Sequence, residues 1–166
     1  VEQDNGHFGK TIAKIFLYST FQKILYTHLS KSISDDIRAI ALKSIKEVDY
    51  HFKHSRAWLL RLGGGTEESK VKIQYSIDEL WRFTGEMFES DDVEKNLTSE
   101  NLITASNSYY NEWSKTVKDT LKEVLLKEPE NVVMLTGGKK GLHTEKLGFM
   151  LAEMQYLPRT YPNAKW

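Results

Sequence analysis

Hydrophobic positions recur in steps of three and four along most of the chain, which is the spacing of one face of an α-helix. The pattern covers about residues 8–29, 35–62, 67–88 and 106–127, and it returns in the later part of residues 137–157. With only 3 prolines and no convincing strand pattern, little interrupts these segments. We therefore predict an all-α fold, a bundle of about five helices in a single domain.

The segment 8–29 is apolar almost all round. Ile12 and Phe16 lie on one side of the expected helix, whereas Leu17 and Phe21 widen the apolar surface to the others. Such a helix is central, with neighbours on several sides. Nothing before it in the sequence could cover all of these faces, so we expect residues 1–166 to be the C-terminal portion of a longer helical domain.

Local signals set several helix boundaries. Ser34 or Asp35 is a good N-cap for the second helix and Thr66 for the third, while the glycines 63–65 suit a helix C-cap and loop. The fourth helix is expected to stop before Pro129 and the fifth before Pro158. The expected core faces of the second, third and fourth helices include Val48, His51, Ser55, Trp58, Val71, Tyr75, Trp81, Phe88, Tyr109, Trp113, Val117 and Leu121.

Composition excludes several classes of protein. Lys+Arg 23 against Asp+Glu 23 leaves no net charge to attract nucleic acid or an anionic membrane. No apolar run is long enough to span a bilayer, and the start has no signal-peptide hydrophobic region. Cysteine is absent, which removes disulfides, thiolate metal sites and a cysteine nucleophile. A cytoplasmic protein is the expectation.

Three long strings carry a family resemblance: "IKEVDYHFKHSRAWLLRLGGGTEES", "IDELWRFTGEMFE" and "GGKKGLHTEKLGFMLAEMQYLPRTYPNAKW". They closely resemble the C subunits of the phenylacetic acid catabolic protein family, and the likeness weakens only over about residues 93–134. The resemblance implies a ferritin-like helical bundle that begins with further helices. It also implies a structural, metal-free subunit of a multicomponent phenylacetyl-CoA epoxidase. In such an enzyme the catalytic A subunit carries the di-iron centre, and a reductase supplies electrons. Self-association is left open.

The metal pattern of a ferritin-like enzyme can be tested directly. A di-iron site takes a Glu from each of two helices and a Glu-x-x-His pair from each of two others. No Glu-x-x-His occurs in the chain. The best candidate positions pair Glu47 with Tyr50 and Glu145 with Gly148, where a phenol and a bare backbone replace the imidazoles. We predict a degenerate site, with no catalytic residue and no metal or other cofactor in this chain.

A weaker metal alternative remains. Glu47, His51 and His54 share one sector of the second helix, and His143 could approach from the last one. The favoured interpretation is that the three histidines are buried or half-buried polar residues that form hydrogen bonds across the bundle, with Tyr50 among their partners.

Two charged clusters stand out. Lys139 and Lys140 lie between glycines just before a predicted helix N-terminus, a setting that suits CoA phosphates, although a solvated turn or a partner contact is the favoured alternative. Asp91, Asp92 and Glu94 are interpreted as a solvated helix cap.

Three function classes follow: a structural subunit of an oxygenase, an independent ferritin-like di-metal oxidoreductase, and a free-standing helical binding protein. The missing ligands and the family resemblance favour the first. Its interface would be large and helical. The tryptophans 58, 81 and 113 are expected in the core, and Trp113 or Trp166 are candidate interface anchors.

Overall fold

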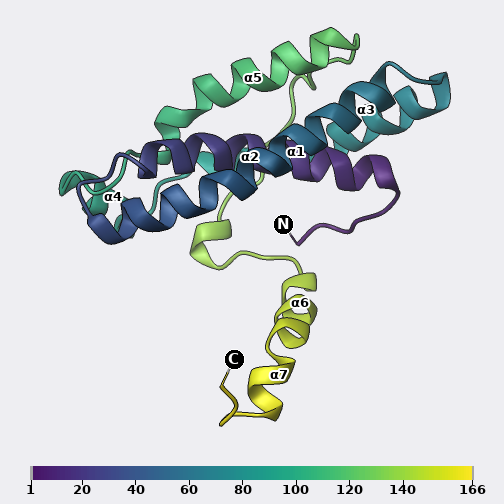
Figure 1. The fold of residues 1–166 in the computed structure, drawn as a ribbon. Coiled ribbons are helices and arrows are strands. Elements are labelled where there is room, and N and C mark those ends of the chain that lie inside the picture. Colours follow the sequence, from purple (N-terminus) through teal and green to yellow (C-terminus); the bar gives the residue numbers. More distant parts are fainter. Residues whose placement is uncertain (1, 166) are drawn as a thin grey trace.

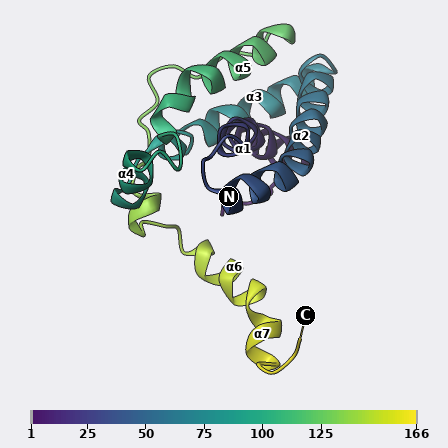
Figure 2. The ribbon, with the colours of Figure 1, turned by 60° about the vertical axis from the view of Figure 1, so that its left-hand side comes forward.

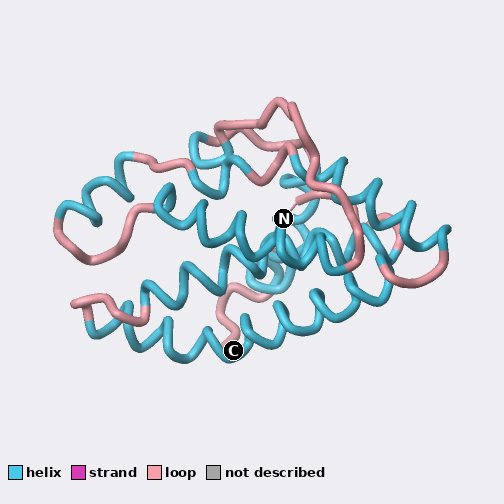
Figure 3. The backbone as a smooth tube through the Cα atoms, turned by 90° about the horizontal axis from the view of Figure 1, so that it is seen from above, coloured by secondary structure: helices cyan, strands magenta, loops and turns pink. Residues whose placement is uncertain are grey.

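The computed structural model describes residues 2–165, and throughout that range the chain forms helices joined by loops and turns, without a strand (Figure 1, Figure 3). The all-α prediction is confirmed. The body of the molecule is built from α1 (Phe8–Leu29), α2 (Asp35–Gly63), α3 (Glu67–Trp81) and α5 (Tyr110–Glu123). Shorter elements are η1 (Gly85–Phe88), α4 (Asp92–Ser99), η2 (Ser106–Tyr109), η3 (Gly138–Lys140), α6 (Lys146–Met154) and α7 (Tyr156–Thr160). Among the helices of this range, none has the length and apolar character that crossing a bilayer requires.

α1 is the central helix of the body. Seen nearly end-on, it lies between α2, α3 and α5 (Figure 2). Ile12, Phe16 and Leu17 are buried, as the nearly all-round apolar sequence predicts. The indole Nε1 of Trp113 on α5 donates a hydrogen bond to the carbonyl of Leu17 at 3.0 Å, which satisfies a polar group that would otherwise be buried alone.

The predicted boundaries of α1 and α2 and the predicted caps are confirmed. The Ser34 side chain accepts a hydrogen bond from the backbone N–H of Ile37, and Thr66 caps α3 in the same way. Gly63 ends α2 where the chain after α5 crosses it. A Cβ on Gly63 would lie 2.6 Å from Cγ2 of Val124, so this crossing requires glycine.

The predicted extent of α3 is wrong, and its predicted core face is only partly right, since Trp81 is buried whereas Val71 and Tyr75 are not. The helix ends at Trp81 and not at Phe88, and the chain continues through the turn η1. Val71 and Tyr75 are 58% and 64% exposed, because the side of α3 that meets α1 is the row of buried residues one or two positions away. That row consists of Ile73, Ser76, Ile77, Leu80 and Trp81.

Three further expectations need correction. The fourth helix ends at Glu123, before Leu125 takes a positive φ of 56°, although its predicted core face is buried from Tyr109 to Leu121. The polar stretch 90–104, for which the sequence predicts no helix, contains α4. The last predicted helix splits into α6 and α7, which extend away from the body and continue through Pro158 (Figure 1). Proline is tolerated there because it lies in the first turn of α7.

Candidate functional site

Lys139 holds the basic loop, residues 136–142, against α4. Its Nζ lies 2.7 Å from Oε2 of Glu94 and also donates a hydrogen bond to the carbonyl of Glu89. Glu94 is only 7% exposed, and its other oxygen accepts a hydrogen bond from the backbone N–H of Ser106. The expectation that Glu94 is solvated is therefore wrong, whereas Asp91 does cap α4 as predicted. The charge of Lys139 is neutralised within the fold.

The pKa of Glu94 reflects this pairing. Burial raises the pKa of the carboxyl group, but the hydrogen bonds from Lys139 and Ser106 outweigh burial and leave the pKa below its ordinary value of 4.5. Glu94 is thus a buried carboxylate held in its charged form. In the sequence, Glu94 is noticeable only as the third acidic residue of a helix-capping cluster. That position indicated a solvated side chain, whereas the side chain is buried.

The loop is not followed directly by a helix, which removes one of the features that suited a site for CoA phosphates. α6 begins only at Lys146, and η3 is a 3-residue turn, so no helix N-terminus of useful length faces the two lysines. Gly137 and Gly141 have φ of 99° and 85°, a conformation that glycine adopts without strain and that lets the chain turn tightly around η3. Lys140 is exposed and is the lysine of the pair that stays available for an external contact.

A cavity of about 400 Å³ lies between α1, the end of α3 and the basic loop. A second hollow of about 450 Å³ adjoins it, since both are lined by Tyr18, Met87 and Lys139. The two hollows are mainly apolar and lie along one side of α1, and together they are called the "α1 groove". Its lining includes Leu17, Tyr18, Phe21, Leu25, Met87 and Val93.

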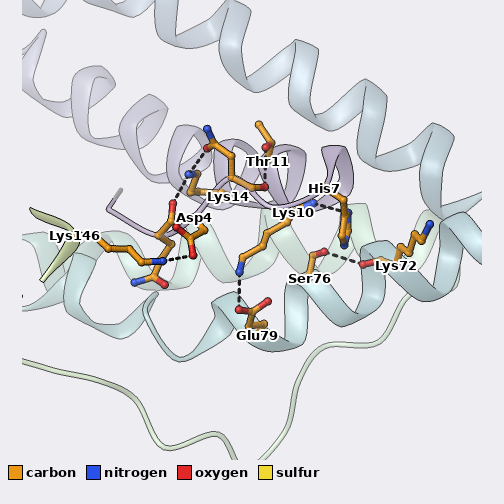
Figure 4. A network of polar contacts seen from close by, with 11 residues as sticks. Asp4, His7, Lys10, Thr11, Lys14, Lys72, Ser76, Glu79 and Lys146 are labelled. Carbon is orange, nitrogen blue, oxygen red and sulfur yellow. Dashed lines mark hydrogen bonds and ion pairs between the residues drawn. The ribbon is translucent and has the colours of Figure 1, made fainter. Parts of the chain in front are cut away.

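The N-terminal segment, residues 2–7 before α1, forms the polar side of the α1 groove. Lys14 Nζ donates hydrogen bonds to the carbonyl of Gln3 and to Oδ1 of Asn5, each at 2.7 Å (Figure 4). Burial lowers the pKa of Lys14, and the nearby charge of Lys10 lowers it further. Lys14 is a half-buried cation that sequence reasoning missed, because on a helical wheel it is one polar position among apolar ones.

The same N-terminal segment holds the start of the C-terminal part. Lys146 forms an ion pair with Asp4 (Figure 4). The backbone N–H of Thr144 donates to Oε1 of Glu2 at 3.3 Å. His143 Nδ1 lies 3.5 Å from the same oxygen. The hydrogen bond and charge of Lys146 hold the pKa of Asp4 below its ordinary value. The contacts of Lys146 with Asp4 and of Thr144 with Glu2 join positions 142 residues apart, so no local pattern could have predicted them.

The degenerate metal positions do not converge. Glu47 and Tyr50 are exposed on α2, and Glu145 is exposed just before α6. Gly148 faces open space, with no atom within 4 Å of a Cβ built there. Within residues 2–165, no three His, Asp or Glu side chains come together in a geometry that could hold a metal ion. The described residues therefore do not fit a di-iron centre, nor a site made of Glu47 and the three histidines.

The expectation that His51, His54 and His143 are buried or half-buried in the bundle is wrong. All three are exposed, and His54 stacks on the exposed ring of Tyr50 with centroids 5.8 Å apart. α2 instead buries small and aliphatic residues toward α1: Ala41, Val48, Ser55 and Leu59. Ser55 fits there because its hydroxyl donates to the carbonyl of His51 and lies 3.4 Å from Ser19 Oγ on α1.

The tryptophans mostly pack internally. Trp81 and Trp113 are buried with ring centroids 5.5 Å apart, and Trp58 is half-buried, with its ring 5.0 Å from that of Phe8. The predicted core role is confirmed for Trp81 and Trp113. Trp113 is only 1% exposed and cannot anchor a partner. Trp166, the other candidate anchor, lies outside the described residues.

Comparison with known proteins adds two findings. A family model described as "Phenylacetic acid catabolic protein" matches residues 1–166. The C subunit of the 1,2-phenylacetyl-CoA epoxidase of Escherichia coli (strain K12) is 43% identical over 166 residues, which are 100% of this chain and 67% of that protein. Both similarities extend over the body, the basic loop and the C-terminal helices.

Proposed function

The chain belongs to the phenylacetic acid catabolic protein family, and we propose that it is a non-catalytic structural subunit of a multicomponent phenylacetyl-CoA epoxidase. In this role it acts in the cytoplasm, in the degradation of phenylacetate, and supports a separate catalytic A subunit. The di-iron chemistry takes place in that partner, whereas this chain provides a folded surface to which the partner binds.

The observation that carries the proposal is the 43% identity with the C subunit of an epoxidase along the whole of this chain. An identity of 43% over 100% of this chain supports a common role better than a short motif would. The match also includes the parts that lie outside the body, α6 and α7, which contribute nothing to its core.

The arrangement of polar residues supports a structural role over a chemical one. Glu47 and Glu145, the carboxylates nearest to a di-iron pattern, are exposed; one lies on α2 and the other just before α6, without a shared cavity. Catalytic acids and bases are usually found in clefts, with pKa values adjusted by burial and neighbouring charge. Among residues 2–165 the carboxylate of a buried residue is that of Glu94, and its ion pair with Lys139 holds the loop against α4.

We propose the outward side of α2 as a docking face for the catalytic subunit. It presents Tyr50, His51 and His54 together, with the Tyr50 ring 62% exposed and stacked on His54. An aromatic surface on a long helix suits a helical interface. Tyr50, His51 and His54 thus belong to the surface of the body, whereas Ser55 on the same helix is buried.

We also propose that Lys140 makes the external contact first considered for the pair of lysines, either with CoA phosphates or with the partner. For a CoA contact, Lys140→Glu raises the apparent KM for the CoA thioester. The effect is larger at low salt, because exposed charges are screened over about 10 Å at 0.1 M ionic strength. Unchanged kinetics with weaker assembly assigns Lys140 to the subunit interface.

Co-expression with a candidate catalytic subunit tests the main proposal. We expect the two chains to co-elute in size-exclusion chromatography, and we expect epoxidation to fall when this chain is left out. Tyr50→Asp should weaken co-elution, whereas the matched variant Tyr75→Asp, at an equally exposed tyrosine on α3, should not. A catalytic subunit that is stable and fully active alone would overturn the proposal. So would two tightly bound irons in this isolated chain after anaerobic loading.

A further inference from the structure

Asn5 and Gly6 form a reactive pair in the N-terminal segment. Both residues are exposed, and Gly6 has a positive φ of 54°. Asn5 is also the one asparagine in these 166 residues that a glycine follows. Because glycine has no Cβ, nothing on Gly6 hinders the approach of its backbone nitrogen to the preceding side chain. The pair therefore leaves the side-chain amide of Asn5 open to attack by the nitrogen of the next residue.

Two donors on α1 hold the two carbonyl oxygens of Asn5. Lys14 Nζ donates a hydrogen bond to the side-chain oxygen Oδ1 at 2.7 Å, and Thr11 Oγ1 donates one to the backbone oxygen at 3.0 Å. Figure 4 shows that Lys14 and Thr11 both come from α1. The surroundings of the amide thus depend on the folded helix, and not on the Asn-Gly dipeptide alone.

The backbone nitrogen of Gly6 is the nucleophile of this pair. Within residues 2–165, its N–H takes part in no hydrogen bond. The peptide nitrogen and the Asn5 carbonyl share one delocalised π system, so the negative charge left by loss of the proton spreads to that oxygen. The hydrogen bond from Thr11 stabilises this charge, and the nitrogen is therefore easier to deprotonate in the folded protein.

Lys14 lies where the second negative charge develops. Attack on Cγ of Asn5 turns Oδ1 into an oxyanion, and a donor that is in place before the reaction stabilises such an oxyanion without further reorganisation. Burial lowers the pKa of Lys14, and no carboxylate forms an ion pair with Lys14 within the described residues, since Asp4 pairs with Lys146. The half-buried ammonium group therefore gains from a negative charge at Oδ1.

We propose that Asn5 is a site of self-catalysed deamidation, assisted by Lys14 and Thr11. The Gly6 nitrogen loses its proton to solvent and forms a bond to Cγ of Asn5. The bond from Cγ to the amide nitrogen then breaks, and this nitrogen leaves as ammonia after taking a proton from water. Water opens the resulting succinimide ring at either carbonyl, which gives aspartate or isoaspartate at position 5. No oxidant, metal or cofactor takes part.

The two products change the N-terminal segment differently. An aspartate at position 5 provides Lys14 with the carboxylate partner that the described residues do not supply. Isoaspartate instead adds one carbon atom to the main chain between Asp4, which pairs with Lys146, and the start of α1. The reaction thus alters the contact that holds the C-terminal part. It goes beyond the structural role proposed above and does not depend on it.

The rate of ammonia loss from Asn5 tests the proposal. Freshly purified protein is kept at neutral pH, folded or unfolded in urea, and the peptide that contains Asn5 is followed by liquid chromatography and mass spectrometry. Deamidation should be about tenfold faster in the folded protein, because both donors are lost on unfolding and a hydrogen bond to a charged group is worth at least that factor. An equal or slower rate in the folded protein overturns the proposal.

Substitutions of the two donors supply a second measurement. In the folded protein, Lys14→Met should slow the reaction about tenfold and Thr11→Val about threefold, because a charged donor stabilises an anion more than a hydroxyl group does. Lys14→Arg keeps a charged donor and should retain most of the rate. Lys10→Met is the matched control, since Lys10 lies on the same helix but pairs with Glu79. A rate in Lys14→Met that equals or exceeds the rate in Lys10→Met overturns the assistance by Lys14.

Discussion

Lys139 and Glu94 lie 45 positions apart in the sequence, and their ion pair of 2.7 Å holds the basic loop against α4. The carboxylate is almost fully buried, and its second oxygen binds the backbone N–H of Ser106 at the start of η2. The Glu94 side chain thus connects α4, the basic loop and the start of η2, three segments that lie outside the packing of the long helices. The position of the loop, and with it one wall of the α1 groove, depends on this contact.

Lys139→Glu should therefore destabilise the protein. The change leaves Glu94 buried without its partner and facing a second carboxylate, which we expect to lower the free energy of unfolding by about 1–3 kcal/mol, given that Lys139 is partly exposed. Lys140→Glu is the matched control, and a surface change of this kind stays within about 0.5 kcal/mol. Urea unfolding measures both. Equal effects of the two variants would contradict an internal role for Lys139.

Acid should weaken this part of the fold. The pKa of Glu94 is lower in the folded protein than its ordinary 4.5, so folding favours the charged form. The stabilisation is fully present above pH 4.5 and is lost as the pH falls through the folded pKa. Unfolding free energies measured from neutral pH downward should show this loss, and Glu94→Gln should reduce the slope below pH 4.5. An unchanged slope in the variant would argue against the contribution of Glu94.

Gly63→Ala should also be destabilising. The added methyl group would overlap Cγ2 of Val124, and overpacking of this kind costs about 1–3 kcal/mol. Gly148→Ala provides the comparison, because the space around that glycine is empty and alanine favours a helix over glycine by about 1 kcal/mol. Thermal unfolding should give a lower Tm for the first variant and an equal or higher Tm for the second. A lower Tm for Gly148→Ala than for Gly63→Ala would mean that the chain after α5 does not pack closely on Gly63.

His51→Ala should leave stability within about 0.5 kcal/mol, because the imidazole is exposed. Ser55→Leu, one helical turn later, should cost about 1–3 kcal/mol, since it forces a larger side chain between α1 and α2 at the point where Ser55 Oγ lies 3.4 Å from Ser19 Oγ. Chemical denaturation of the two variants distinguishes the surface of α2 from its packed side. A large loss of stability in His51→Ala would mean that the histidine is part of the core after all.

Glu145→Gln should leave turnover of an assembled epoxidase complex largely intact. The Glu145 carboxylate is exposed, lies outside the body and caps no helix with its side chain. The measurement is the rate of epoxidation by a complex of normal composition and stability. Abolished turnover in such a complex would require a direct chemical role for this carboxylate and would overturn the structural one.

Much of the fold is local and could be predicted from the sequence. The bounds of α1, the cap at Ser34, the cap at Thr66 and the glycine end of α2 depend on residues within a few positions of each other. The nearly all-round apolar surface of α1 also predicts its central place without reference to any partner. The absence of a Glu-x-x-His pattern is likewise a property of the sequence alone.

Tertiary structure decided what local patterns leave undetermined. α3 carries apolar residues on two sides, and only packing against α1 selects Ile73 and Ile77 over Val71 and Tyr75. The pairing of Lys139 with Glu94, and of Lys146 with Asp4, joins distant parts of the chain, and periodicity contains no information about such pairs. Helical spacing fixes which residues share a face, whereas the neighbour that covers the face fixes whether it is core or surface.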